Sequence, residues 1–599
     1  MKSKTSFFNP GLFKSTVRRF WPLWAIHFAG WLLFMPVLTL VNNLGTAESD
    51  NFAYSLLDGS VAAAPIVAFF MAIFTAMAVF GFMYNSRSTG LIASLPIKRE
   101  AVFFSSWLSG IVPVLASNLI IALLTFLFSL SADLNPALLL KAVWIWLAVY
   151  SMDFILFFGI ASIIAVITGS MVALPVLYII FNFLALGMEL VVRTYLASLI
   201  WGMGNLEYSS VLDFLSPLVY LVSGSGMTVK YQYFDVASNL GAITVSGECV
   251  KVYFESWIAV SLYCAAGILL SAAALPVFKK RRMESAGDVI AVPALRPVFK
   301  YGVAVCCALC GGIVLYMMLY ALFNEPAISV FLMIPSMCLF AFVGYFGAKM
   351  LLHKSFHVFR GSWIGYVVMC FACAIFVLSC DIDVFGVGSY VPDASDVESV
   401  TVYNVGEIKS EDAIEKFIAL HEKLISKKDE YRYTSAESDY STGIYFRYKL
   451  KNGDIVTREY ALPGESECVT EYFDLMNDPA VLLEQFAPSV PVDTEHFIAG
   501  AFYGNFTAQD YTLTSEQAVD YYHNALIPDI KSGNKIIDNN YENDLGTLTI
   551  TLRLDTYGEF DSDYTDLVVE INSECTNSIK WLQDNLGVDL TEIAVTYYD

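Results

Sequence analysis

Nine apolar stretches, each about 20 residues long, leave little choice of fold for most of this chain. A helix of about 20 apolar residues crosses the roughly 30 Å hydrocarbon core of a bilayer. Only 15% of the residues are charged, against about 25% in soluble proteins. We therefore predict an all-α polytopic membrane bundle with nine transmembrane helices. The predicted spans are 21–41, 61–83, 105–130, 142–167, 171–195, 256–278, 301–323, 327–349 and 362–380.

Two chemically different parts of the chain meet at Cys380. Residues 1–380 hold 21 Lys and Arg against 15 Asp and Glu, which is a net charge of +6. Residues 381–599 hold 14 basic and 42 acidic residues, which is a net charge of −28. The net charge of −22 for the whole chain therefore describes neither part. The apolar composition excludes a disordered or fibrous chain.

The positions of the basic residues predict an orientation, because cytoplasmic loops of membrane proteins are rich in Lys and Arg. With a cytoplasmic N-terminus, alternating spans place 17 of the 21 basic residues of the apolar part inside. An odd number of spans places residues 381–599 outside. We expect a multi-pass protein of the cell membrane with an extracellular C-terminal domain. The first apolar run is too long for a signal peptide, so none is expected.

The segment before the first span has helical amphipathic spacing. Apolar and basic side chains alternate there in a pattern that predicts an interfacial helix over 9–21. An ordinary basic flank of the first span is the alternative. The residues that define the two faces are Leu12, Phe13, Val17, Arg18 and Arg19.

Residues 84–101, between the second and third spans, are too polar to cross a bilayer. We predict a short helix from Ser88 to Leu95 with Leu91, Ile92 and Leu95 on one face. Pro96 ends it, because the residue before a proline avoids helical geometry. Apolar side chains in such a loop need a partner surface, and docking onto the bundle itself is the alternative. The candidate residues of this segment are Ser88, Leu91, Ile92, Leu95, Pro96, Lys98 and Arg99.

Four stretches are familiar in combination: TSFFNPGLFKSTVRRFWPLW, NSRSTGLIASLPIKRE, RRMESAGD and HKSFHVFRGSWIGY. Together they resemble permease subunits of type-2 (ABC-2-like, exporter-like) ABC transporters. More narrowly, they resemble Gram-positive bacterial permeases with three extra spans and a large extracellular C-terminal domain. The resemblance covers most of the chain, and the combined layout is more specific than any single motif.

The resemblance implies an amphipathic elbow helix before the first span and a coupling helix that sits in a groove of the ATPase. In this chain the resemblance assigns the elbow helix to residues 9–21 and the coupling segment to residues 88–99. It also implies an outer re-entrant helical hairpin within 201–255. The implied domains are the elbow (1–20), a six-helix permease core (21–278), a cytoplasmic linker (279–300), three additional spans (301–380) and an acidic extracellular α+β domain (381–599).

The chain contains no G-x-x-x-x-G-K-[ST] motif, so no phosphate-binding loop of its own is expected. ATP and Mg would act through a partner, a dimer of ABC ATP-binding subunits. A second permease copy or a paralogue, and the lipid membrane, are the other expected partners, and no nucleic acid is. The CxxC spacings at Cys307 and Cys370 lie inside apolar spans, so we predict no zinc site.

The expected function is transport without an enzyme activity in this chain. A separate ATPase would drive the export or removal of an amphiphilic or peptide-like compound. One alternative is an ATPase-coupled membrane sensor or mechanotransmitter that acts through its extracellular domain without transport. A polytopic membrane enzyme is a weaker alternative, because no catalytic constellation is present in the spans.

Ionisable groups at membrane depth are costly and therefore functional candidates. Asp153 lies in the middle of the fourth span, where it is a candidate for lining a conduit. A hydrogen bond to a Ser or Tyr on a neighbouring helix, or a protonated acid, is the alternative. Glu189 and Arg193 are four residues apart and can pair on one face of the fifth span. An interfacial ion pair is the alternative for them. His27 in the first span is interpreted as a core histidine.

The acidic part carries signs of an internal duplication. The sequence SEDAI at Ser410 recurs as SEQAV at Ser515, and SEC at Ser466 recurs at Ser573, with offsets of 105 and 107 residues. We predict two β-α-β-β-α units, over about 397–490 and 497–599, with a split-βαβ arrangement as one candidate topology. Asn452 and Gly453 predict a hairpin turn. The predicted strands are 400–403, 444–450, 455–460, 497–503, 547–555, 566–571 and 593–598.

Cys468 and Cys575 occupy equivalent positions in the two predicted repeats. Outside the cell they could form a disulfide bond, and two independent thiols are the alternative. The charge of −28 has two interpretations as well. An acidic face could attract cations or cationic peptides, or it could serve solubility in a charged cell wall.

Overall fold

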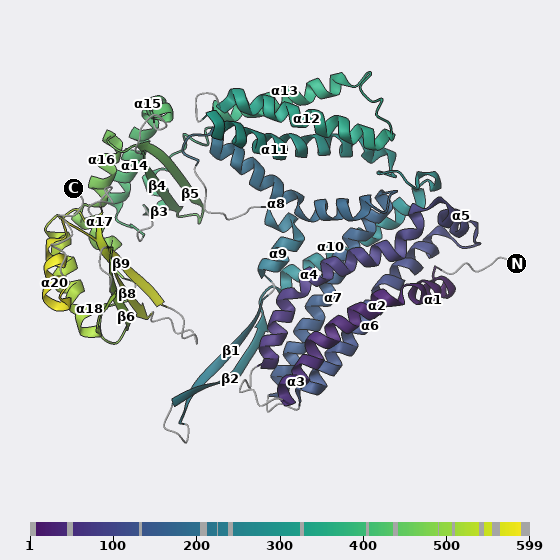
Figure 1. Ribbon diagram of the computed structural model, residues 1–599, viewed down its shortest axis with the longest axis horizontal. Helices are drawn as coiled ribbons and strands as arrows, with labels where there is room; N and C mark the ends of the chain where they lie inside the picture. Colours follow the sequence, from purple (N-terminus) through teal and green to yellow (C-terminus); the bar gives the residue numbers. More distant parts are fainter. Residues whose placement is uncertain are drawn as a thin grey trace. The chain divides into compact units, whose positions relative to one another are not determined.

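The structure is a computed structural model in which two compact units are separable, and each is described by itself (Figure 1). The first unit comprises Met1–Val192, Ser209–Gly311 and Cys338–Cys370. The second comprises Arg193–Tyr208, Gly312–Met337 and Phe371–Asp599. The structure describes residues 7–44, 52–130, 135–203, 212–224, 226–237, 243–323, 329–402, 407–434, 441–488, 490–505, 510–537, 544–553 and 564–588.

Nine helices within the described residues are long and apolar enough to cross a membrane, which confirms the predicted number of apolar runs. The first is interrupted by a π-helical turn at Leu33–Val37, where Pro36 removes a backbone donor. These helices are α2 (Trp21–Leu32) with α3 (Leu38–Leu44), α4 (Phe52–Phe80), α6 (Arg99–Ser129), α7 (Pro136–Ile167), α8 (Ala173–Leu199), α10 (Trp257–Lys280), α11 (Arg296–Phe323), α12 (Ser329–His353) and α13 (Trp363–Asp381).

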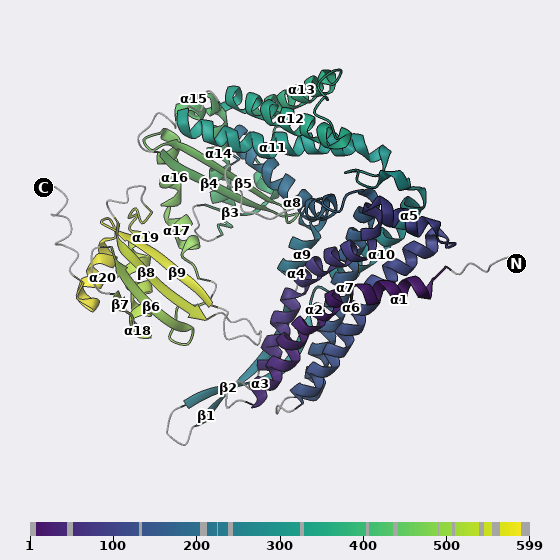
Figure 2. The ribbon, with the colours of Figure 1, turned by 45° about the vertical axis from the view of Figure 1, so that its right-hand side comes forward.

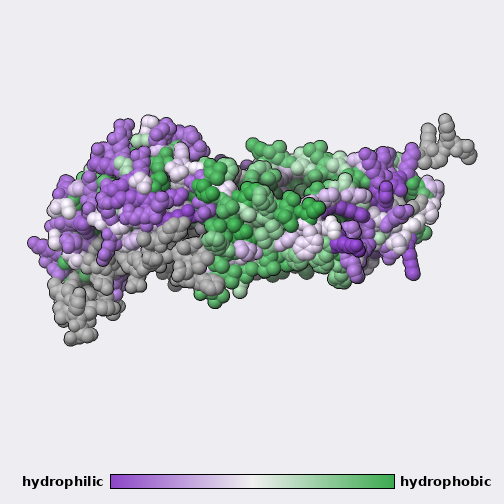
Figure 3. Space-filling model, turned by 90° about the horizontal axis from the view of Figure 1, so that it is seen from above, coloured by the Kyte–Doolittle hydropathy of each residue, from purple (hydrophilic) through white to green (hydrophobic). Residues whose placement is uncertain are grey.

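Many large apolar side chains on these helices face outward, as is typical of helices surrounded by lipid. The space-filling view shows them as a broad hydrophobic area over the long helices, whereas hydrophilic side chains cover the C-terminal sheets (Figure 3). The helices are therefore compatible with a multi-pass membrane protein.

Residues 227–237 and 243–254 form two paired strands, so the predicted helical hairpin within 201–255 is wrong for this part. Strand β1 (Met227–Ala237) pairs antiparallel with β2 (Ile243–Phe254). Both sequences are rich in β-branched and aromatic residues, which favour strands over helices. Among the described residues, the 3-10 turn Asp213–Leu215 and the short helix α9 (Pro217–Gly224) precede the strands, and Asp58 on α4 accepts the Met227 backbone N–H at 2.9 Å.

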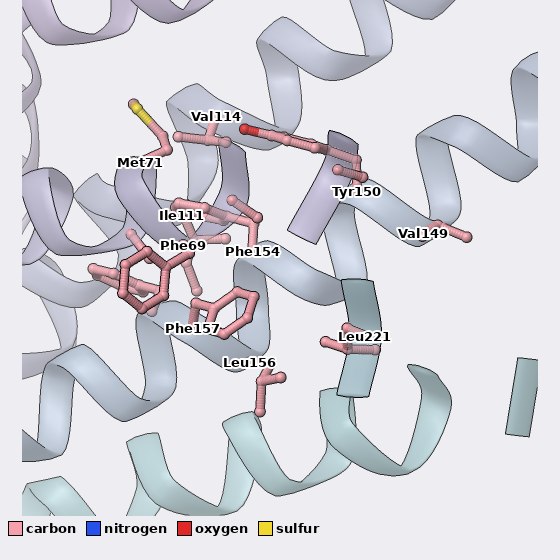
Figure 4. Close-up of a cluster of buried hydrophobic side chains, with 14 of the residues drawn as sticks. Phe69, Met71, Ile111, Val114, Val149, Tyr150, Phe154, Leu156, Phe157 and Leu221 are labelled. Carbon is pink, nitrogen blue, oxygen red and sulfur yellow. The ribbon is translucent and has the colours of Figure 1, made fainter. Parts of the chain in front are cut away.

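Helix α7 is the centre of the first unit and packs against α4, α6 and α10. A Cβ on Gly267 of α10 would lie 2.4 Å from the Leu156 Cα, so only glycine allows this approach to α7. Phe69, Phe154 and Phe157 converge next to α6 in the buried cluster (Figure 4). Interlocked side chains of this size hold the bundle at interior packing density.

Two antiparallel sheets form the main part of the second unit (Figure 2). The first has the strand order β3-β4-β5 and the second β7-β6-β8-β9. The strands are β3 (Val397–Thr401), β4 (Ser441–Leu450), β5 (Ile455–Pro463), β6 (Phe497–Gly504), β7 (Asp510–Thr512), β8 (Asp544–Arg553) and β9 (Tyr564–Asn572). The helices are α14 (Glu411–Ser426), α15 (Lys428–Thr434), α16 (Glu467–Met476), α17 (Pro479–Gln485), α18 (Ser515–Tyr521), α19 (Ile527–Lys531) and α20 (Thr576–Leu586).

The order strand, helix, strand, strand, helix occurs twice in the second unit, except that a second short strand, β7, precedes the helices of the second half. However, the first strand of each half pairs antiparallel with the strand that follows the helices, β3 with β4 and β6 with β8. A split-βαβ unit needs a parallel crossover, so that candidate topology is wrong. The predicted turn at Asn452 and Gly453 joins β4 to β5, and Gly453 has a φ of 90°. The predicted strand 593–598 lies outside the described residues.

His421 lies at the centre of the first half of the second unit and is fully buried. Its Nδ1 is 3.1 Å from the Tyr448 hydroxyl and its Nε2 is 2.8 Å from the Tyr460 hydroxyl. The imidazole ring also stacks on Phe446 at 4.9 Å. Burial, helped by the charge of Arg458, lowers the pKa of His421 to about 3. The imidazole is therefore neutral in the folded domain.

This histidine should make the C-terminal domain less stable in mild acid. Below its ordinary pKa of about 6.5 the unfolded chain binds a proton that the folded domain excludes. Between pH 7 and pH 5 the wild type should therefore lose about 2 kcal/mol more unfolding free energy than His421→Gln. Pulse proteolysis of the full chain in urea measures both. An identical pH dependence in the two proteins would contradict the buried neutral state.

Candidate functional site

The short helix α5 (Ser86–Ser94) is present where the sequence predicts a helix ended by Pro96. Asn85 caps its N-terminus, where its side-chain oxygen accepts the Arg87 backbone N–H at 3.0 Å. The Thr89 hydroxyl donates to the backbone oxygens of Phe82 and Asn85, both at 2.9 Å. Leu95 is extended, as expected for a residue before proline. Local hydrogen bonds therefore define both the start and the end of α5.

The apolar residues of α5 divide between two faces. Ile92 is half-buried and packs against the core of the first unit, as does Ile97 beyond the helix. Leu91 is 68% exposed and Leu95 is 40% exposed. The predicted common face of Leu91, Ile92 and Leu95 is therefore split. One part anchors α5 to the bundle, while Leu91 and Leu95 present apolar surface outward.

Other exposed residues surround these two leucines. Ser94 and Pro96 adjoin them and Lys98 follows, all exposed, whereas Ser88 is half-buried. An apolar patch bordered by polar and basic groups is typical of a protein contact surface. We call Leu91, Ser94, Leu95 and Pro96 the α5 outer face.

Arg99 holds two helices of the bundle together rather than extending the α5 outer face. Its Nη1 donates to the backbone oxygens of Lys279 at 2.8 Å and Arg281 at 3.1 Å, at the end of α10. A cation at a helix C-terminus is favourable, because carbonyl groups there lack partners in the helix. Glu100 also forms an ion pair with Lys279. The start of α6 is therefore tied to the end of α10.

Arg281 is a central residue of this site that the sequence did not distinguish from its three basic neighbours. It is buried, and its Nη1 donates to the backbone oxygens of Ala165 and Val166, both at 3.1 Å. Its Nη2 donates to the Met83 backbone oxygen at 3.3 Å. Burial lowers the pKa of the Arg281 guanidinium, and the nearby Tyr84 opposes this shift. Arg281 thus joins the end of α7 to the turn that leads into α5.

A small cavity of about 100 Å³ lies behind α5. Arg99, Arg281 and the inward residues of α5 border it, so the side of α5 that faces the bundle is not fully packed. Its lining residues are Phe82, Met83, Thr89, Ile92, Ile97, Arg99, Val102, Phe278 and Arg281.

The linker after α10 is packed against the bundle, and only part of it is the solvated basic segment that its composition suggests. Ile290 forms a β-bridge with Thr168, and the Gly169 backbone N–H donates to the Asp288 oxygen at 2.9 Å. The Asp288 carboxylate accepts from Lys354 at 2.7 Å and from Arg296 at 3.1 Å. Asp288 therefore links the loop before α8 to the starts and ends of the later helices.

The predicted N-terminal amphipathic helix is α1 (Pro10–Arg19). Its Asn9 cap is tied to α6, because the Asn9 backbone N–H donates to the Ser105 hydroxyl at 2.8 Å. Leu12 and Val17 pack against the core, and Phe13 is half-buried on the same side. Lys14, Arg18 and Arg19 are exposed on the other side.

The three charged residues predicted in the spans lie in different environments. Asp153 is buried in the middle of α7, with 1% of its surface exposed. Glu189 accepts the Leu212 backbone N–H at 3.0 Å. Arg193 is half-buried one turn further along α8, and its pairing with Glu189 stays a prediction. The structure does not bring these residues together with α5.

Cys468 and Cys575 are both buried free thiols, so no bond joins them in the structure. Burial raises the pKa of Cys575 to about 12 and also raises the pKa of Cys468. Thiols of this kind are poor nucleophiles, because disulfide exchange needs the thiolate.

No family model, no curated protein and no solved structure matches this chain. The functional argument therefore rests on the sequence pattern and on the geometry of the described residues.

Replacing Arg281 should loosen α5, while replacing its exposed neighbour Arg282 should not. Arg281→Gln leaves carbonyl oxygens at the end of α7 and before α5 without their donor, at a cost of about 2–4 kcal/mol. Hydrogen exchange over residues 82–99 of the detergent-solubilised chain should rise in Arg281→Gln and stay at the wild-type level in Arg282→Gln. Equal exchange in the two variants would contradict the anchoring role.

Proposed function

We propose that this chain is the membrane-spanning permease subunit of an ABC transporter, driven by a separate ATPase. The observation that carries the proposal is the α5 outer face. Leu91 and Leu95 are exposed on a short helix whose opposite side is anchored to the bundle. Exposed apolar side chains on a well-anchored helix favour docking of a partner.

The contacts behind α5 explain how a push on this helix would reach the membrane. Thr89 connects α5 to the 3-10 turn Gly81–Tyr84 that follows α4, and Ile92 packs against the core of the first unit. Arg281 connects the same turn to α7. Arg99, just beyond α5, connects α6 to α10. Movement of a docked ATPase would therefore be passed to four long helices through short backbone and guanidinium contacts.

The remaining parts fit the same proposal. α1 serves as the elbow helix in the membrane interface, with the N-terminus in the cytoplasm and the C-terminal domain outside the cell. ATP and Mg are bound by the ATPase dimer, and a second permease copy or a paralogue completes the conduit. The transported compound is amphiphilic or peptide-like. We also propose that the C-terminal domain arose by duplication, since β3, α14, β4, β5 and α16 follow the same order as β6, α18, β8, β9 and α20, with β7 as an addition in the second half.

Negative charge introduced on the α5 outer face should prevent the ATPase from binding to this chain. We expect Leu91→Glu with Leu95→Glu to lower the co-purifying, vanadate-sensitive ATP hydrolysis at least about ten-fold, as loss of an apolar contact centre does. Phe356→Glu is the matched control, because Phe356 is 80% exposed in the loop after α12. Undiminished hydrolysis with the double variant, or none with the wild type, would refute the docking assignment.

A second candidate function is mechanical signalling through the C-terminal domain, and contacts within the second unit favour it. Trp201, just after α8, packs against Tyr460 of β5 with tilted rings whose centres are 4.6 Å apart. Arg432 donates to the Leu199 backbone oxygen at 2.9 Å and to the Asp381 carboxylate at 2.6 Å. The first sheet is therefore fastened to the ends of α8 and α13, so that helix movement would reach it.

ATP-dependent flux separates the two candidate functions. In liposomes that contain the chain and its ATPase, transport predicts ATP-dependent movement of a fluorescent amphiphile across the membrane. Signalling predicts no such movement, together with an ATP-dependent change in protease protection over β5. Trp201→Ala should abolish that change in protection, whereas the exposed control Tyr503→Ala should leave it intact.

A further inference from the structure

The chain leaves α13 through a loop that presents large apolar side chains outward. Ile382 is 69% exposed, Val384 is 63% exposed and Phe385 is 82% exposed. We call residues 382–390 the α13 exit loop and these three side chains its outer face. Apolar side chains of this size gathered within four residues indicate contact with an apolar partner, and the proposed function gives them no role.

The start of the α13 exit loop is tied to the last turn of α13. The Asp383 backbone N–H donates to the Cys380 oxygen, and the Val384 backbone N–H donates to the Ser379 oxygen, both at 3.1 Å. Asp383 has a φ of 54°, so the helix ends in a Schellman motif with a residue other than glycine in the left-handed conformation. The backbone of Val384 therefore lies beside the last turn of α13 and not beyond it.

The Asp383 carboxylate fixes the rest of the loop. Its two oxygens accept the backbone N–H groups of Val387 at 2.8 Å, Gly388 at 3.0 Å and Ser389 at 3.1 Å. The Ser389 hydroxyl donates to the same carboxylate at 3.1 Å. Hydrogen bonds to an ionised acceptor are the stronger kind, so an ordered turn holds Phe385 outward.

The inner side of the loop is attached to the C-terminal domain. Arg458 on β5 is buried, and its Nη2 donates to the backbone oxygens of Val387 at 2.6 Å and Tyr390 at 3.4 Å. A Cβ on Gly388 would lie 2.5 Å from the Ile200 Cγ2, so the loop backbone packs directly against the residue that follows α8. The α13 exit loop thus joins its outer face to β5.

The length of α13 places the outer face at the boundary of a bilayer. The helix has 19 residues, and its first charged residue is Asp381 at its end. It is therefore about 28 Å long, against roughly 30 Å for the hydrocarbon core. A membrane-spanning α13 ends at the edge of the hydrocarbon, and the bond from Val384 to Ser379 keeps the outer face at that level.

The outer face also continues an exposed apolar face of α13. Phe371, Ile375 and Leu378 are exposed and precede Ile382 at intervals of four, three and four residues. Residues at this spacing lie on one side of a helix. Lipid that surrounds a membrane-spanning α13 covers this side, and the same acyl chains then reach the outer face.

Charge argues against an attraction to lipid headgroups. The α13 exit loop has no basic residue, and residues 381–599 carry a net charge of −28. Anionic lipids attract basic segments and repel acidic ones. Contact between this loop and the membrane therefore depends on apolar burial.

We propose that the outer face inserts among lipid acyl chains at the bilayer boundary next to α13. This rests on the membrane-spanning role of α13 in the proposed function, but on neither transport nor the ATPase. Because Arg458 ties the loop to β5, insertion seats the first sheet of the C-terminal domain on the membrane surface.

Photocrosslinking of the full chain in lipid nanodiscs tests the insertion. Phe385→p-benzoylphenylalanine should form adducts with phospholipid that fragment to an acyl-chain attachment. Tyr503→p-benzoylphenylalanine is the matched control, because Tyr503 is an exposed aromatic residue on β6. Position 385 should give at least about ten-fold more lipid adduct, since burial of one aromatic side chain shifts a partition equilibrium by at least that factor. The yield should be the same in phosphatidylcholine and phosphatidylglycerol, at low and at high salt.

Hydroxyl-radical footprinting of the unmodified chain in the same nanodiscs is the second measurement. Phe385 should be oxidised less than Tyr503 although its side chain is the more exposed of the two. Adducts of position 385 with a second copy of the chain, adducts with headgroups alone, or equal lipid adducts at 385 and 503 would overturn the proposal. Strong oxidation of Phe385 would overturn it as well. Neither measurement includes an ATPase, so these outcomes are distinguishable from failure of the α5 docking assignment.

Discussion

One guanidinium group, that of Arg281, bonds to the backbone where several elements of the first unit meet. It donates to carbonyl oxygens at the end of α7 and to the oxygen of Met83 just before α5. Helix ends leave carbonyl groups without partners, and a buried cation is tolerated only when donors and acceptors match. The Arg281 guanidinium donates to the free carbonyl oxygens, and these oxygens in turn accept from the buried cation. The position of α5 therefore depends on the end of α7.

This arrangement separates the roles of neighbouring residues in the candidate site. Ile92 faces the bundle and Arg281 holds the turn before α5, so α5 is a rigid part of the bundle, whereas Leu91 and Leu95 remain outward. A surface that transmits force needs both properties, because a loosely attached helix would move without the bundle.

Some expectations failed where local sequence is ambiguous. The region between α8 and α10 was expected to be helical by resemblance, yet its alternating β-branched and aromatic residues form β1 and β2. In the C-terminal domain the strands, the helices and the turn at Gly453 follow from spacing and turn chemistry. Their pairing does not, because parallel and antiparallel neighbours can share the same strand pattern.

The sequence by itself determined the number of long apolar helices, the contrast between a basic and an acidic part, and the short helix ended by Pro96. These features depend on composition and on periodicity over a few turns, which the chain carries locally. Only the tertiary structure decided that Arg281 is buried while Arg282 is exposed, that Ile92 faces inward, and that Asp153 has no hydrogen-bond partner among the residues that the structure describes. Such properties depend on which distant carbonyls, rings and helices surround a side chain, and adjacent identical residues can meet opposite surroundings.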